Sequence, residues 1–80
     1  MYERLNPGDM VLIRDDAEHI PENVKRNLYV VNAVEREEEK GVITEQNVSL
    51  REIDCLPILI DDAPYTSIFL DSKYVYKRGS

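Results

Sequence analysis

Four neighbouring residues carry the side chains of this chain that are best suited to chemistry. The sequence DDAEH places Asp15, Asp16, Glu18 and His19 close together. Carboxylate oxygens and an imidazole nitrogen could jointly bind Mn, Zn or Mg. The segment lacks the second histidine of a zinc-protease helix and the twelve-residue pattern of a calcium loop. We therefore predict a solvated loop in which an aspartate caps a turn, and no metal site.

The sequence also lacks the usual sets of catalytic residues. It has one histidine and one cysteine, and it contains no CxxC pair, phosphate-binding glycine loop or GxSxG motif. Adjacent Asp61 and Asp62 would point to opposite faces of a strand, so they are unsuited to sharing a proton. We expect a helix cap there. The sequence predicts a protein that is not an enzyme and has no cofactor.

A second candidate surface combines aromatic and basic side chains near the carboxyl end. It comprises Tyr65, Tyr74 and Tyr76 with Lys73, Lys77 and Arg78. Aromatic rings with interleaved cations can stack single-stranded bases. Tyrosine and arginine are equally enriched as anchors in protein interfaces. A third, structural interpretation has Tyr74 and Tyr76 packing against a sheet with their hydroxyls in water.

Charge and hydropathy exclude or disfavour several classes of partner. Ten basic residues against 16 acidic ones give a net charge of −6, which disfavours nucleic-acid binding because the surface repels phosphate. Residues 71–80 nevertheless carry a small local excess of positive charge. The acidic run at 35–40 is typical of a solvated hairpin tip. No apolar run approaches the roughly 18 residues of a membrane helix, so we predict no membrane span.

The single cysteine bears on the compartment and on the core. Cys55 cannot form an internal disulfide, which favours a reducing compartment or a homo-oligomer. The first nine residues do not resemble a secretory signal, so we expect a cytoplasmic protein. Because Cys55 lies between Ile53 and Leu56, we predict that its thiol is buried in the core. An apolar edge at residues 55–60 could pair with a second copy.

The elements that position these residues are mostly short strands. The sequence predicts strands at 10–14, 28–36, 42–45 and 73–77, and a loop at 15–27 with a helical turn at 21–25. Residues 47–53 suit a short strand or a strand that enters a one-turn helix. Within 28–36, alternation places Tyr29, Val31 and Ala33 on one face, opposite Val30 and Val34.

The segment between residues 55 and 70 is harder to assign. Pro57 cannot donate to a strand ladder, so residues 55–60 are predicted to be an edge strand, the start of a strand or an extended segment. The sequence DDAP is typical of a helix start. We therefore favour a short helix over a strand for residues 65–70.

Short strands separated by turns predict a mainly β fold. We expect residues 1–80 to form a single domain, a small antiparallel barrel of about five strands with one short helix near the carboxyl end. Closing the sheet into a barrel would remove its exposed edges.

The arrangement of NPGDMVLIR, a long polar loop, LYVVNAVER, a charged hairpin and GVITEQNVSLREI resembles small SH3-like barrels. The resemblance covers about the first 53 residues and implies a binding module with the loop at 15–27 beside its groove. KOW and Tudor-like barrels of this kind bind nucleic acids or modified side chains, usually with additional glycines or an aromatic cage. This chain has three glycines and no tryptophan.

These observations predict a non-enzymatic protein-interaction module. The predicted binding residues are Tyr65, Tyr74, Tyr76, Lys77, Arg78, Asp15 and Asp16. The alternative is a KOW-like nucleic-acid-binding barrel that uses the carboxyl-terminal tyrosine, lysine and arginine residues. A third hypothesis is an acidic nucleic-acid mimic, whose carboxylates would have to lie along one face.

Overall fold

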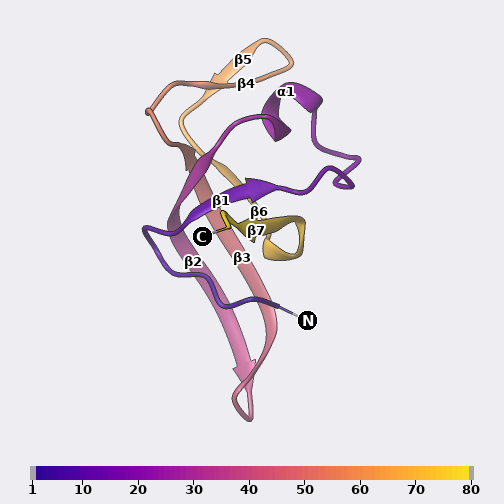
Figure 1. Cartoon of the computed structure of the whole chain (residues 1–80), viewed down its shortest axis with the longest axis vertical. Helices are drawn as coiled ribbons and strands as arrows, with labels where there is room; N and C mark the ends of the chain where they lie inside the picture. The colour runs from indigo at the N-terminus through magenta and orange to yellow at the C-terminus, as the bar shows by residue number, and fades with distance from the viewer. Residues whose placement is uncertain (1, 80) are drawn as a thin grey trace.

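The computed structural model describes residues 2–79 and is mainly β (Figure 1). Its strands are β1 (Met10–Ile13), β2 (Tyr29–Glu39), β3 (Val42–Glu52), β4 (Ile58–Ile60), β5 (Ala63–Tyr65), β6 (Ile68–Asp71) and β7 (Val75–Lys77). The helices are α1 (Glu22–Lys25) and the 3-10 helix η1 (Ser72–Tyr74). The predicted strand at 10–14 and the helical turn at 21–25 are thereby confirmed.

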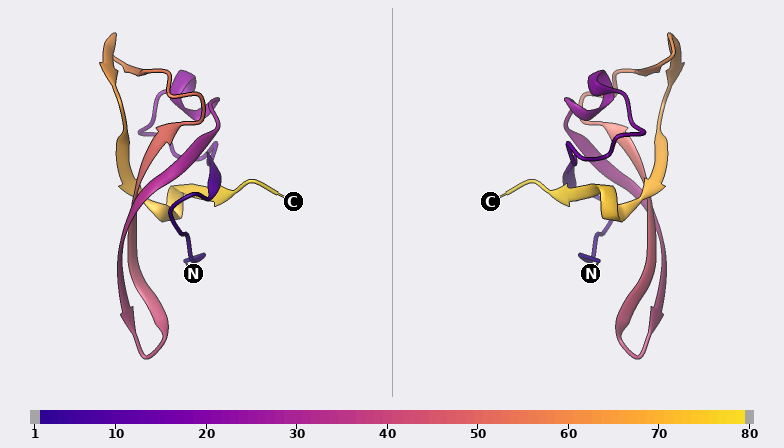
Figure 2. Two further views of the ribbon diagram at one scale, coloured as in Figure 1. Left: turned by 90° about the vertical axis from the view of Figure 1, so that its left-hand side faces the viewer. Right: turned by 90° about the vertical axis from the view of Figure 1, so that its right-hand side faces the viewer.

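Five strands form one antiparallel sheet in the order β6-β3-β2-β1-β7, and β4 and β5 form a separate hairpin. The sheet is not a closed barrel, so the predicted closure is wrong. Within residues 2–79, β6 and β7 each pair with a single neighbour. The physical reason is length: β2 and β3 have 11 residues each, whereas β6 has four and β7 three. The edge strands β6 and β7 run at an angle to each other (Figure 2) and do not pair.

The β2–β3 hairpin is longer than the sequence indicates and gives the molecule its elongated shape of 42 × 24 × 24 Å. Its turn uses Lys40 (φ 53°) and Gly41 (φ 80°), between the paired residues Glu39 and Val42. Positive φ at both central positions matches the right-handed twist of the flanking strands. The segments predicted as two strands, 42–45 and 47–53, form the single strand β3.

A bulge in β2 changes which side chains face the core. The register with β3 shifts between Val31 and Ala33, which leaves Asn32 without an opposite residue. Tyr29 and Val31 are buried on the core face of β2, as the alternation predicts. Ala33, which should follow them on that face, is exposed, and Val34 packs against the core in its place. The alternation predicted for 28–36 is therefore wrong beyond Val31, because an inserted residue reverses the side-chain direction.

The predicted helix at 65–70 is also wrong. Asp61 and Asp62 have φ values of 52° and 64° and form the two-residue turn between β4 and β5, a left-handed conformation that aspartate tolerates better than most residues. They do not cap a helix. The following chain becomes β6, which pairs with β3 through four residue pairs from Leu50↔Ile68 to Asn47↔Asp71. Pairing with a formed sheet overrides the weak local helix signal.

Cys55 lies outside the core, contrary to the prediction. The residue is exposed, and its φ of 62° belongs to the turn that follows β3, where its N–H donates to the Glu52 carbonyl. The Arg51 guanidinium lies 3.1 Å from its sulfur. The core is built instead from the following buried residues: Leu5, Val11, Ile13, Ala17, Val24, Tyr29, Val31, Val48, Leu50, Ile58 and Val75.

One buried amide joins the amino-terminal segment to the sheet. The Gln46 side chain on β3 is completely buried, and its Nε2 donates to the Glu3 carbonyl (2.7 Å) and to the Ser72 hydroxyl (2.9 Å). Its Oε1 accepts from the Leu5 backbone N–H (3.1 Å) and from Arg36 Nε (3.0 Å). All four hydrogen-bonding positions of the amide are therefore occupied.

Replacing Gln46 should destabilise the protein strongly. Gln46→Ala would leave several buried polar groups without partners, and each such group costs about 1–3 kcal/mol. We expect the free energy of unfolding to fall by about 3 kcal/mol or more in urea denaturation. Glu45→Ala, at the exposed neighbouring position, should change it by less than about 0.5 kcal/mol. A similar small loss for both variants would contradict this role of Gln46.

Candidate functional site: an apolar groove beside strand β6

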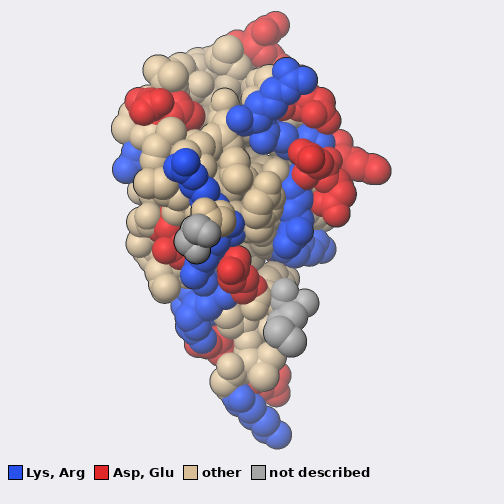
Figure 3. Space-filling view, in the orientation of Figure 1, with Lys and Arg blue, Asp and Glu red and all other residues tan. Residues whose placement is uncertain are grey.

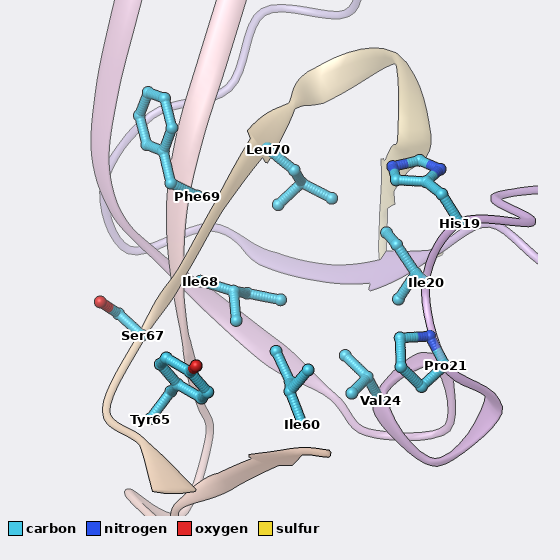
Figure 4. Close-up of a pocket in the computed structure, with 10 residues that line it drawn as sticks. All are labelled: His19, Ile20, Pro21, Val24, Ile60, Tyr65, Ser67, Ile68, Phe69 and Leu70. Carbon is cyan, nitrogen blue, oxygen red and sulfur yellow. The ribbon is translucent and has the colours of Figure 1, made fainter. Parts of the chain in front are cut away.

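A mainly apolar groove of about 430 Å³ opens between β6, the β4–β5 hairpin and the segment that contains α1 (Figure 4). Its lining residues are His19, Ile20, Pro21, Val24, Ile60, Tyr65, Ser67, Ile68, Phe69 and Leu70. A hollow of this size and composition is typical of a binding site. It lies beside part of the 15–27 loop, where the resemblance to SH3-like barrels placed a groove.

Strand β6 forms one wall of the groove. Ile68 and Leu70 point into it, toward Ile20 and Val24 on the opposite wall, whereas Phe69 points away (Figure 4). Ile68 and Leu70 stand opposite Leu50 and Val48 of β3, both buried, so this face of β6 continues the hydrophobic core outward. The β4–β5 hairpin closes one end of the groove with Ile60 and Tyr65.

The opposite wall is held in place by hydrogen bonds at α1. The buried Tyr29 hydroxyl donates to the Val24 carbonyl at 2.7 Å, and burial raises the pKa of this phenol above its ordinary value. Asn23 Nδ2 donates to the Leu59 carbonyl of β4 at 2.9 Å. Because these contacts reach both the core and the β4–β5 hairpin, they fix the position of α1 relative to the groove.

Lys25 secures the loop that precedes α1. Its ammonium, nearly buried, donates to the Asp15 carbonyl at 2.9 Å and pairs with the Glu22 carboxylate at 2.9 Å. The Lys25 ammonium therefore connects Asp15, at the start of the 15–27 loop, to α1 near the end of that loop. A cation that is both hydrogen-bonded and ion-paired can be buried without a large desolvation penalty.

His19 and Tyr74 join the loop to η1. Their rings meet edge to face, with centroids 4.6 Å apart and an interplanar angle of 64°. The Lys73 ammonium lies 5.2 Å from the centre of the Tyr74 ring. Tyr74 is partly buried against the core and is absent from the groove lining. Tyr74 therefore holds His19, a groove residue, in position from outside the groove.

Acidic residues flank the groove on two sides. The segments 15–22 and 60–62, which include four groove residues, contain six carboxylates and no lysine or arginine, and one of the six, that of Glu22, is paired with Lys25. Figure 3 shows acidic side chains gathered over the loop between β1 and α1 and over the β4–β5 turn. The surroundings of the groove are thus negative, which would favour a basic ligand.

The predicted tyrosine-rich surface is divided between two edges of the sheet. Tyr65 lines the groove on the β6 side, 47% exposed. Tyr76 and Lys77 lie on β7, the opposite edge strand, followed by Arg78. The sequence brings these side chains near one another, whereas the fold separates them, because β6 and β7 are on opposite sides of three central strands.

Around β7, basic and aromatic side chains form a second cluster. The Arg14 guanidinium stands 5.6 Å from the centre of the Tyr76 ring. Lys77 Nζ is 3.9 Å from the Asp9 carboxylate, and Arg78 Nη1 is 3.9 Å from the Met10 sulfur. Part of the positive charge of this cluster is therefore balanced within the protein.

Asp15 and Asp16 lie exposed in the turn that follows β1. Asp16 borders a small polar hollow with Arg14 and Lys73, apart from the apolar groove. His19 turns toward Tyr74 rather than toward these carboxylates. Across residues 2–79, no group of three His, Cys, Asp or Glu side chains is arranged to hold a metal ion.

Sequence reasoning missed the aliphatic residues that make most of the groove. They are Ile20, Val24, Ile60, Ile68 and Leu70. A partial signal was present: Ile20 and Val24 stand four apart in an otherwise polar loop, the spacing of one helical face. Ile68 and Leu70 have the spacing of one strand face, but only the strand assignment of 68–71 reveals it.

Comparisons with known protein families, with curated proteins and with solved structures found no match to this chain. No helix in the described part of the chain is long and apolar enough to cross a membrane.

The different settings of Tyr74 and Tyr76 predict different effects on stability. Tyr74→Ala removes the edge-to-face contact with His19 and part of the core packing, and should lower the free energy of unfolding by about 2 kcal/mol. Tyr76→Ala removes an exposed ring whose cation–π contact is with Arg14 and should cost less than about 1 kcal/mol. Urea denaturation of both variants measures the difference, and equal losses would contradict the support role of Tyr74.

Proposed function

We propose that this protein is a non-enzymatic interaction module that binds a segment of a partner protein in the groove beside β6. The observation that carries the proposal is the groove itself, an aliphatic hollow of about 430 Å³ with Tyr65 at its rim. Apolar surface of this kind, surrounded by polar residues, is typical of protein interaction sites. An exposed tyrosine at the rim is a common energetic anchor.

The lining favours binding over catalysis. Its polar side chains are His19, Tyr65 and Ser67, and no carboxylate or thiol belongs to it. The imidazole of His19 meets the Tyr74 ring edge to face. A nucleophile, a base and a group that orients the base are the usual minimum for nucleophilic catalysis, and this lining does not supply them together.

The rigidity of the walls supports binding of a short segment with useful affinity. Hydrogen bonds from Tyr29 and Asn23 fix α1, and the pairing of β6 with β3 fixes the other wall. A groove that is already formed does not have to be ordered on binding, so more of the interaction free energy appears as affinity. We further propose a cytoplasmic location, because the exposed Cys55 is a free thiol.

The test is capture of a partner by groove variants. The tagged full-length protein would be incubated with nuclease-treated lysate of its source, and bound protein quantified by mass spectrometry. We expect Tyr65→Ser to reduce recovery of the partner at least about tenfold, the effect of losing about 1.4 kcal/mol of binding free energy. Because Tyr65 is 47% exposed, the variant should fold normally.

Val42→Ser is the matched control, since Val42 is 60% exposed and lies at the end of the β2–β3 hairpin, away from the groove (Figure 1). It should capture as much partner as the wild-type protein. Equal capture by Tyr65→Ser and Val42→Ser would overturn the groove as the interaction site.

A second candidate function is binding of single-stranded nucleic acid at β7. The observation that favours it is the Arg14 guanidinium over the exposed Tyr76 ring, with Lys77 and Arg78 next in the chain. Aromatic faces with neighbouring cations can stack bases and contact phosphates. The net charge of −6 opposes this function.

Fluorescence anisotropy with a labelled oligothymidylate tests this candidate. If the function is present, affinity should fall steeply with salt, by about 0.7 log units per phosphate contact for each tenfold rise in concentration. The Lys77→Ala, Arg78→Ala double variant should bind about tenfold more weakly. The control is the Arg26→Ala, Lys40→Ala double variant, which removes two exposed cations elsewhere. Absence of binding at low salt would exclude this candidate.

A further inference from the structure

We infer that the ligand of the groove is an extended peptide segment with alternating apolar and basic residues, which joins the sheet as an additional strand along β6. This inference rests on the proposed function, because it names the chemistry and the binding mode of the partner segment at the same groove.

Strand β6 has an edge at which a further strand can pair. It is the last strand of the sheet order, and its only pairing partner within residues 2–79 is β3. In an antiparallel pair, alternate residues direct their backbone N–H and C=O groups away from the partner. Two of the four residues of β6 therefore direct their backbone donors and acceptors outward, along an edge of roughly 13 Å.

The groove runs along this edge. Four consecutive residues, Ser67 to Leu70, belong to its lining, although successive side chains of a strand point to opposite faces. Ile68 and Leu70 point into the groove and Phe69 points away, so the groove lies on the Ile68 and Leu70 face of β6 (Figure 4). The groove therefore borders β6 on this face, and the side chains of Ile20, Ile68 and Leu70 point into the space between β6 and the loop that carries Ile20 (Figure 4).

The edge of β6 has no lysine, proline or bulge to prevent strand addition, although the strand is short and ends in Asp71. Natural edge strands are commonly protected by lysine, proline or a bulge. The sequence of β6 is IFLD, and its four pairs with β3 run without a register shift. The other edge strand, β7, ends in Lys77. Phe69, 60% exposed on the outer face, adds to the apolar character of β6.

The side chains around the edge define the residues of the peptide. Alternate side chains of an added strand would point between Ile68 and Leu70 on one wall and Ile20 and Val24 on the other, so aliphatic residues fit those positions. The intervening residues would face outward, and the acidic segments 15–22 and 60–62 make the surroundings of the groove negative. Lysine or arginine suits those positions.

Charge argues against a second copy of this chain as the occupant. Each copy carries a net charge of −6, and the segments beside the groove contain six carboxylates without a lysine or arginine. Pairing two β6 edges would bring these acidic segments together and be opposed by repulsion. A basic extended segment from another protein meets no such repulsion.

Alternating N-methylation provides the test. The probe is an acetylated and amidated peptide of about eight residues with alternating lysine and valine, long enough to span β6. Two derivatives carry N-methyl groups on all the valines or on all the lysines. In a docked strand, alternate amides face β6, so one derivative should lose affinity at least about tenfold while the other stays within about twofold of the unmodified peptide.

Binding would be measured by isothermal titration calorimetry at about 50 mM salt, where charge attraction is weakly screened, and located by amide chemical shifts of the 15N-labelled full-length protein. We expect the largest shifts and the strongest slowing of hydrogen exchange at 67–71. A peptide with glutamate in place of lysine is the charge control and should bind at least about tenfold more weakly.

Each contrary outcome has a distinct meaning. Equal binding of both N-methylated derivatives would overturn strand addition, while capture of a partner through Tyr65 would still support the proposed function. Shifts confined to residues outside 67–71 would also overturn the inference. A dimer detected by sedimentation, together with amide shifts at 67–71 that depend on protein concentration and no binding of the peptide, would identify a second copy as the occupant. That outcome would also overturn the inference.

Discussion

The structure depends on a single fully buried amide. Gln46 sits in the middle of β3 and satisfies the Glu3 carbonyl, the Leu5 N–H, the Arg36 guanidinium and the Ser72 hydroxyl. These partners belong to the amino-terminal segment, to β2 and to η1. In a domain of this size the hydrophobic core is small. Directional hydrogen bonds such as those of Gln46 therefore help to hold the amino-terminal segment, β2 and η1 in one arrangement.

The position of η1 links this amide to the groove. Ser72 begins η1 and Tyr74 ends it, and Tyr74 contacts His19 in the loop that forms one wall. The same short helix follows directly on β6, which forms the other wall. Within η1, Ser72 thus contacts Gln46 and Tyr74 contacts His19, a groove residue. The connection between β6 and β7 through η1 therefore contributes to the shape of the groove.

The open sheet explains why the apolar groove lies where it does. Closing the sheet would have paired β6 with β7 and removed both edges. The four-residue strand β6 pairs with β3, the three-residue strand β7 pairs with β1, and the two do not pair with each other. The edge of β6 beside the apolar groove is therefore left without a strand partner within residues 2–79. The other edge, at β7, carries Lys77 with an Asp9 partner. The two edges thus differ in chemistry, which gives the two candidate functions separate locations.

The sequence by itself determined the mainly β class, the strand at Met10–Ile13, the loop with its helical turn and the absence of the motifs typical of catalysis, because these follow from local composition and periodicity. Tertiary structure alone decided the rest. Pairing with β3 made a strand of Ile68–Asp71, where the DDAP sequence favours a helix. The bulge at Asn32 exchanged Ala33 for Val34 on the core face. The groove joins residues 19–24 to 60–70, a long-range contact that no local pattern encodes.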